Sequence, residues 1–98
     1  MKKKHCMTES VLQQQIIKAA KSRGILALKV EAVGRRGLPD LLLIRNGRTV
    51  HMEVKSPKGT GRLSVLQTRM IDTLQAHGAE IFVVDSLQKA VAMLDTML

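Results

Sequence analysis

The sequence is poor in aromatic residues and in cysteine. Its 98 residues include one Phe, no Trp, no Tyr and a single Cys. Proteins that read single-stranded nucleic acid by stacking bases on aromatic side chains are therefore a disfavoured class. One Cys cannot build an internal disulfide framework, which favours an intracellular protein. The sequence also lacks any run of about 18 apolar residues, so we expect neither a membrane-spanning helix nor a membrane partner.

The chain is short and begins with a basic segment. A length of 98 residues fits a single domain, which we place at residues 8–98. Residues 1–7 contain three consecutive lysines and are predicted to form a basic arm. No apolar segment follows these lysines, so a secretory signal is not expected.

Acidic residues are scarce and unevenly placed. The chain has 16 basic and 8 acidic residues, a net charge of +8, and all basic residues except Lys89 lie before residue 72. A basic surface of this kind usually binds a polyanion, with nucleic acid as the first candidate, although a solvated surface is the alternative. Acidic side chains within such a region oppose phosphate binding unless a cation lies between the carboxylates and the phosphate. The four acids in the basic part are Glu9, Glu31, Asp40 and Glu53.

Apolar spacing and turn residues predict an α/β fold with the element order α-β-β-β-α-β-α. One sheet with helices packed on it is the simplest arrangement. The predicted strand over residues 38–44 is almost continuously apolar, so we expect it to be central and buried on both faces. The other strands are predicted at residues 25–30, 49–55 and 80–84. The helices are expected to begin at Thr8 or Ser10, at Ser64 and at Ser86.

A hairpin turn at Asn46-Gly47 sets the pairing of two predicted strands. Asn-Gly between apolar runs is the strongest short signal for a hairpin. Counting outward from the turn places Asp40 opposite Glu53, on one face of the sheet and about 5 Å apart at Cβ. The same count pairs Arg45 with Arg48, Ile44 with Thr49, and Leu38 with Lys55.

Two carboxylates placed opposite each other repel, which would raise a carboxylate pKa. A divalent cation between Asp40 and Glu53 would remove the conflict. Oxygen ligands of this kind suit Mg²⁺ or Mn²⁺, with waters and phosphate oxygens completing the coordination. The alternative is that Asp40, which follows Pro39, is only a turn residue at the entry to a strand.

Further polar residues are candidates for the same site. Glu9 lies on the core-facing stripe of the first helix and needs a partner there, unless it is simply a first-turn Glu that favours the helix dipole. Lys55 shares a strand face with Glu53 and could act on a water beside a metal-bound phosphate, or could be a surface ion-pair lysine. His51, on the same face, is more readily explained as a packed histidine than as a ligand.

These residues carry a family resemblance. Glu9, the Gly37-Leu38-Pro39-Asp40 stretch and Glu53-Val54-Lys55, in this element order, resemble the PD-(D/E)XK nuclease superfamily. The finer similarity, which includes Gln67, is to its VRR-NUC (virus-type replication-repair nuclease) branch in a stand-alone, phage-type form. It covers residues 8 to about 84. It implies a restriction-endonuclease-like core with a mixed four-stranded sheet, and a protein in the cytoplasm of a bacterial host.

The resemblance implies a role for each motif residue. Lys55 would position or activate the attacking water, and Gln67 would help to hold the catalytic strand or the scissile phosphate. Gln67 could instead be only the capping-box partner of Ser64. The implied ligands of Mg²⁺, for which Mn²⁺ could substitute, are Asp40, Glu53, the backbone carbonyl of Val54 and, through a water, Glu9.

The implied activity is hydrolysis of DNA phosphodiesters that leaves a 5′-phosphate, without a small-molecule cofactor. Similarity to archaeal Holliday-junction resolvases adds selectivity for branched DNA and a homodimer. Met93 and Met97, off the main apolar stripe of the last helix, are expected to be exposed and could serve a dimer interface or fill a gap. The alternative is a non-catalytic DNA- or RNA-binding module with the same fold. Candidate phosphate contacts are Arg35, Arg36, Lys58 and Arg62, unless they are only solvated surface.

Overall fold

In the part of the chain that the structure describes, three helices and four strands occur in the predicted order. The computed structural model describes residues 8–31, 34, 36–57 and 62–98. Within this part of the chain no helix is long and apolar enough to cross a membrane. The elements are α1 (Glu9–Ser22), β1 (Leu26–Lys29), β2 (Leu41–Arg45), β3 (Arg48–Val54), α2 (Val65–Ala76), β4 (Glu80–Val84) and α3 (Leu87–Asp95).

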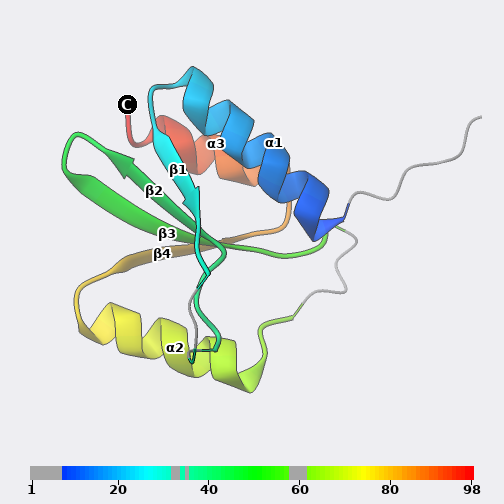
Figure 1. The fold of residues 1–98 in the computed structure, drawn as a ribbon, viewed down its shortest axis with the longest axis vertical. Coiled ribbons are helices and arrows are strands. Elements are labelled where there is room, and N and C mark those ends of the chain that lie inside the picture. The colour runs from blue at the N-terminus through cyan, green and yellow to red at the C-terminus, as the bar shows by residue number, and fades with distance from the viewer. Residues whose placement is uncertain (1–7, 32–33, 35, 58–61) are drawn as a thin grey trace, which may run out of the picture.

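The four strands form one mixed sheet in the order β1-β2-β3-β4. β1 pairs antiparallel with β2, β2 antiparallel with β3, and β3 parallel with β4. Helices α1 and α3 lie on one side of this sheet and α2 lies on the other (Figure 1). The predicted α/β class with a mixed four-stranded sheet and flanking helices is therefore confirmed.

The β2–β3 hairpin turns at Asn46 and Gly47. Both residues have positive φ, 51° and 81°, as a two-residue turn of this type requires. The pairs Arg45–Arg48 and Ile44–Thr49 are present as predicted, and pairing continues to Leu41–Met52.

The predicted strand start at Leu38 and the Leu38–Lys55 pair are wrong, because β2 begins only at Leu41. Pro39 has no N–H to donate to a ladder and is fully buried. The N–H of Lys55 donates instead to the carbonyl of Val84, at 2.8 Å, which extends the pairing of β3 with β4.

The core lies between the sheet and the helices α1 and α3. Met93 and Met97 are 6% and 5% exposed, so the expectation that they are exposed is wrong. The guanidinium groups of Arg45 and Arg48 donate to the carbonyls of Met97 and Thr96, which holds the end of the chain against the sheet. The buried hydrophobic residues are Leu12, Ile16, Ala20, Ile25, Leu41, Leu43, Val50, Met52, Val54, Val84, Ala90, Met93, Leu94 and Met97.

The opposite face of the sheet is only partly covered. Leu42 and Ile44 of β2 are half-buried. The expectation that this strand is buried on both faces is therefore wrong for the face that carries these two residues. In the neighbouring strand β1, Leu26 and Leu28 remain 54% and 44% exposed. The reason is that α2 packs beside β4 at the far edge and does not extend across the sheet.

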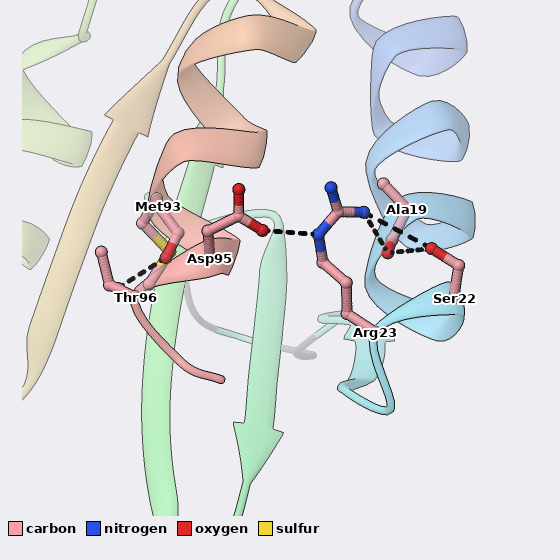
Figure 2. A network of polar contacts seen from close by, with 6 residues as sticks. All are labelled: Ala19, Ser22, Arg23, Met93, Asp95 and Thr96. Atoms are coloured by element: carbon pink, nitrogen blue, oxygen red, sulfur yellow. Dashed lines mark hydrogen bonds and ion pairs between the residues drawn. The ribbon is translucent and has the colours of Figure 1, made fainter.

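Side-chain hydrogen bonds fix the helix ends. Thr8, not Ser10, caps α1 by accepting from the N–H of Val11, whereas the capping box predicted for Ser64 is present. At the other end of α1, Arg23 donates to the carboxylate of Asp95 at 2.8 Å and so ties α1 to α3 (Figure 2).

Gly37 brings the loop before β2 against the backbone of α2. Its φ is +83°, and a Cβ there would lie 2.6 Å from the carbonyl oxygen of Leu66. We expect Gly37→Ala to lower the free energy of unfolding by about 2 kcal/mol or more, through combined backbone strain and clash. Gly34→Ala is the matched control, because Gly34 has a φ of +79° but no atom within 4 Å of the added Cβ. Urea unfolding of both variants separates the two effects, and equal losses would contradict the close approach.

Candidate active site

Asp40 is held in place through both its backbone and its side chain. It directly precedes β2, one position beyond the Leu41–Met52 pair and therefore beside Glu53. Its Oδ2 accepts a hydrogen bond from the backbone N–H of Val54 at 2.8 Å. Its carbonyl accepts from the N–H of Val30 at 2.9 Å. The side chain of Asp40 thus accepts the hydrogen bond from Val54 that a backbone carbonyl would accept if β2 extended further.

Glu53 is an acid with almost no exposure to solvent. The residue is 2% exposed, and its Oε2 accepts from Nε2 of Gln67 at 2.7 Å. The same oxygen lies 3.1 Å from the Lys55 ammonium. Burial raises the pKa of Glu53, and the negative charge of Asp40 raises it further, while Lys55 acts in the opposite direction. The charge of Lys55 therefore does not fully offset the burial of Glu53 and the repulsion from Asp40, so the ionised form of Glu53 is disfavoured.

Gln67 connects helix α2 to Glu53 on β3 and to Lys55, which directly follows that strand. Its Oε1 accepts from the Lys55 ammonium at 2.8 Å and from the backbone N–H of Ser64 at 2.9 Å. The alternatives for Gln67, capping partner or site residue, are thus compatible, since one amide makes both sets of contacts. Because the Lys55 side chain is only 12% exposed, the amide fixes the ammonium at a definite place.

Glu9 and His51 lie at the margins of this cluster. Glu9 is half-buried in the first turn of α1, and its charge adds to the rise in the pKa of Glu53. His51 stands between Leu42 and Ile81 in the sheet, and burial lowers its pKa. These surroundings suit a packed neutral histidine.

The chemistry of the donors fits a hard cation. In the described part of the chain, no three His, Cys, Asp or Glu side chains group closely enough to hold a metal by themselves. Two neighbouring carboxylates are present, however, and the buried one has a raised pKa. Mg²⁺ commonly uses only one or two protein carboxylates, with waters and substrate phosphate supplying the rest. Asp40 and Glu53 match that requirement.

The structure describes only part of the predicted DNA-binding set. Arg36 and Arg62 are exposed in the two loops that flank the carboxylates. Arg35 and Lys58 lie outside the described residues. The place of Gly37 in the motif does not reveal its structural role, which is to let the loop of Asp40 lie against the backbone of α2. A glycine three residues before the acid was the available signal.

Comparison with known proteins places the chain. A family model described as "VRR-NUC domain" matches residues 2–88. The chain belongs to the VRR-NUC family. Two solved structures are similar, one titled "VRR_NUC domain" (TM-score 0.80, 25% identity, 94% of this chain and 100% of that one) and one titled "VRR_NUC domain protein" (TM-score 0.75, 18% identity, 95% and 89%). No curated protein sequence matches the chain. The VRR-NUC assignment implies a nuclease-fold domain, as the resemblance suggested.

The raised pKa of Glu53 predicts a gain in stability when its charge is removed. Because the folded pKa exceeds the ordinary value of 4.5, ionised Glu53 destabilises the metal-free fold at neutral pH. We expect Glu53→Gln to raise the melting temperature in EDTA at pH 7 by about 4 °C, equivalent to ~1 kcal/mol. The gain should shrink as the pH falls through the raised pKa towards 4.5, where wild-type Glu53 is protonated.

Thermal unfolding at pH 7 and pH 4.5 measures this effect. Glu80→Gln is the control, because the hydrogen bond from Arg48 lowers the pKa of Glu80 and no gain is expected. A loss of stability in Glu53→Gln at pH 7 would show that the ion pair with Lys55 outweighs burial.

Proposed function

We propose that this VRR-NUC domain is a Mg²⁺-dependent DNA endonuclease. The observation that carries the proposal is the shared position of Asp40, buried Glu53 and Lys55 at one end of the hairpin, where Gln67 is hydrogen-bonded to both Glu53 and Lys55. A basic chain that places two carboxylates beside one lysine matches a metal-assisted phosphodiesterase better than a simple phosphate-binding surface.

The residues of the site would have separate roles in metal binding and in positioning the attacking water. Asp40, Glu53 and the carbonyl of Val54 would hold the cation, and Glu9 would reach it through a water. The bound cation would supply Lewis-acid polarisation of the scissile phosphate and charge neutralisation. Lys55, positioned by Gln67, would orient the attacking water through its ammonium or, once deprotonated to the neutral amine, accept a proton from that water. The water oxygen would bond to phosphorus as the bond from phosphorus to the 3′ oxygen breaks. The attacking water would lose one proton to the Lys55 amine or to solvent, and the leaving 3′ oxygen would take one proton from solvent, which gives a 5′-phosphate and a 3′ hydroxyl.

The substrate would be duplex or branched DNA. Arg36 and Arg62, with Arg35 and Lys58, would contact phosphates on either side of the carboxylates. We propose that the domain spans residues 8–98 after a basic arm and works as a homodimer, as in stand-alone phage-type members of the family. Two sites at fixed spacing would select branched, junction-like DNA.

Incubation of four-way junction and linear duplex DNA with the protein in Mg²⁺ or in EDTA tests the proposal. We expect cleavage that requires Mg²⁺, products with 5′-phosphate ends, and faster cutting of the junction. Salt-sensitive binding without metal-dependent cutting, by protein whose fold is intact, would instead support the non-catalytic binding module.

A further inference from the structure

The first turn of α2 contacts both segments that carry the candidate metal ligands. Gln67, the third residue of this helix, donates to Glu53 of β3 and accepts from Lys55. In the loop that leads to β2, a Cβ on Gly37 would lie 2.6 Å from the carbonyl oxygen of Leu66 and 3.1 Å from the nitrogen of Gln67. The position of this turn therefore affects the geometry of the whole site.

Ser64, the N-cap of α2, holds Gln67 at two points. Its hydroxyl accepts from the backbone N–H of Gln67 at 3.1 Å, and its own backbone N–H donates to Oε1 of Gln67 at 2.9 Å. The first contact fixes the main chain of the glutamine, and the second fixes its side chain. The serine that begins the helix thus constrains an amide that belongs to the site.

These contacts allow only one orientation of the Gln67 amide. A backbone N–H and a lysine ammonium can only donate hydrogen bonds, so both must face the amide oxygen. Oε1 lies 2.9 Å from the nitrogen of Ser64 and 2.8 Å from the ammonium of Lys55. Nε2 can only donate, and it faces Oε2 of Glu53 at 2.7 Å. An amide turned the other way would lose all three hydrogen bonds.

Helix α2 packs only lightly on the sheet. None of its 12 residues is buried, and its contacts with the other elements are mainly with β4. A helix of this length is marginal unless it buries an apolar face. A glutamine side chain also has several rotatable bonds, whose freedom must be lost for its amide to stay in one place. The hydrogen bonds of the first turn therefore contribute more to the position of Gln67 than they would in a buried helix.

We propose that Ser64 is a positioning residue for phosphodiester cleavage, an inference that rests on the proposed function. By fixing the Gln67 amide, Ser64 keeps the Lys55 ammonium at a definite place, 3.1 Å from the Glu53 carboxylate. A misplacement of about 1 Å in a reacting geometry can cost about 100-fold in rate. Without the cap, Gln67 leaves its position for part of the time. Loss of the cap should therefore lower kcat and leave KM for DNA unchanged.

Cleavage kinetics of Ser64→Ala test this role, with Ser86→Ala as the matched control. Ser86 caps α3 by accepting from the N–H of Lys89 at 3.1 Å, the same distance as the cap bond of Ser64. Helix α3 lies on the side of the sheet away from α2 (Figure 1). Each variant loses one cap, so we expect each melting temperature to fall by about 4–8 °C. Only Ser64→Ala should lower kcat, by about tenfold, which is less than the cost of complete misplacement.

Two further variants separate positioning from stability. Ser64→Thr supplies another hydroxyl at the N-cap and should restore most of the kcat that Ser64→Ala loses. Ser64→Gly lacks the hydroxyl, but glycine at an N-cap is nearly as stable as serine. It should therefore fold even if Ser64→Ala does not, and we expect it to show the same loss of kcat.

Three results would overturn the proposal. The first is wild-type kcat in Ser64→Ala or Ser64→Gly, or an equal loss in Ser64→Ala and Ser86→Ala. The second is a raised KM at unchanged kcat, because the hydroxyl would then act by contacting DNA. The third is a loss of kcat that Ser64→Thr does not restore.

A second measurement does not depend on cleavage. In the metal-free, DNA-free protein, the Nε2 group of Gln67 donates to Glu53, so proton–nitrogen NMR spectra report this contact. We expect the side-chain amide resonances of Gln67 to move towards those of a free glutamine in Ser64→Ala and to stay in place in Ser86→Ala. If the wild-type protein cuts no DNA, the proposed function is wrong, whereas resonances that do not move would overturn the inference about Ser64 itself.

Discussion

Replacing Asp40 with Asn is expected to lower the rate of DNA cleavage in Mg²⁺ by about 1,000-fold or more, the effect of losing several kcal/mol of metal-derived stabilisation of the transition state. The fold should be retained, because the Asn carbonyl can still accept from the N–H of Val54. DNA binding should be unchanged or slightly tighter, since one negative charge near the phosphates is lost.

Single-turnover cleavage and a binding titration in Ca²⁺ or EDTA measure the two effects separately. Asp72→Asn is the control, because Asp72 is an exposed acid on α2 and away from the carboxylate pair. Normal cutting by Asp40→Asn would mean that the cation is held elsewhere. Loss of both binding and cutting, with an intact fold, would mean that Asp40 contacts DNA rather than metal.

Replacing Lys55 with Met is expected to reduce cleavage by about 100-fold to 10,000-fold, the range typical of losing a positioned acid-base group. The same change should tighten the binding of Mn²⁺. The ammonium of Lys55 lies 3.1 Å from Oε2 of Glu53, so in the metal-free protein it stands where it repels an incoming cation. Activity and metal affinity should therefore change in opposite directions.

Calorimetric titration with Mn²⁺ and cleavage assays on the same preparations test this prediction. Lys89→Met is the matched control, because Lys89 forms an ion pair of 2.8 Å with Asp85 at an exposed position. If Lys55 is only an ion-pair lysine, both variants will cut DNA at the wild-type rate. Weaker Mn²⁺ binding in Lys55→Met would contradict the repulsion.

The hairpin and its carboxylates could be predicted because the signals were local. Asn46-Gly47 specifies a two-residue turn, and strand alternation then places Asp40 next to Glu53 without any tertiary information. Ser64 and Gln67 likewise form a three-residue capping motif that is visible in the chain. The further contacts of Gln67 with Glu53 and Lys55 depend on how α2 docks, and only the family resemblance suggested them.

Features that depend on tertiary packing were harder to predict. The burial of Met97 follows from hydrogen bonds that Arg45 and Arg48 donate across the molecule to the end of the chain. The apolar run of β2 indicated two covered faces, but sequence alone does not reveal that α2 packs beside β4 and leaves one face of β2 only partly covered. The late start of β2 arises because the Asp40 side chain, rather than its backbone, pairs with Val54.

Titration of the wild-type protein with Mn²⁺, beside Asp40→Asn, Glu53→Gln and Asp72→Asn, tests the central claim that Asp40 and Glu53 bind one hard cation. We predict that the wild-type protein and Asp72→Asn bind with the same affinity, and that each of the other two variants binds at least about tenfold more weakly, a loss of ~1.4 kcal/mol. Unchanged affinity in both Asp40→Asn and Glu53→Gln would contradict the claim.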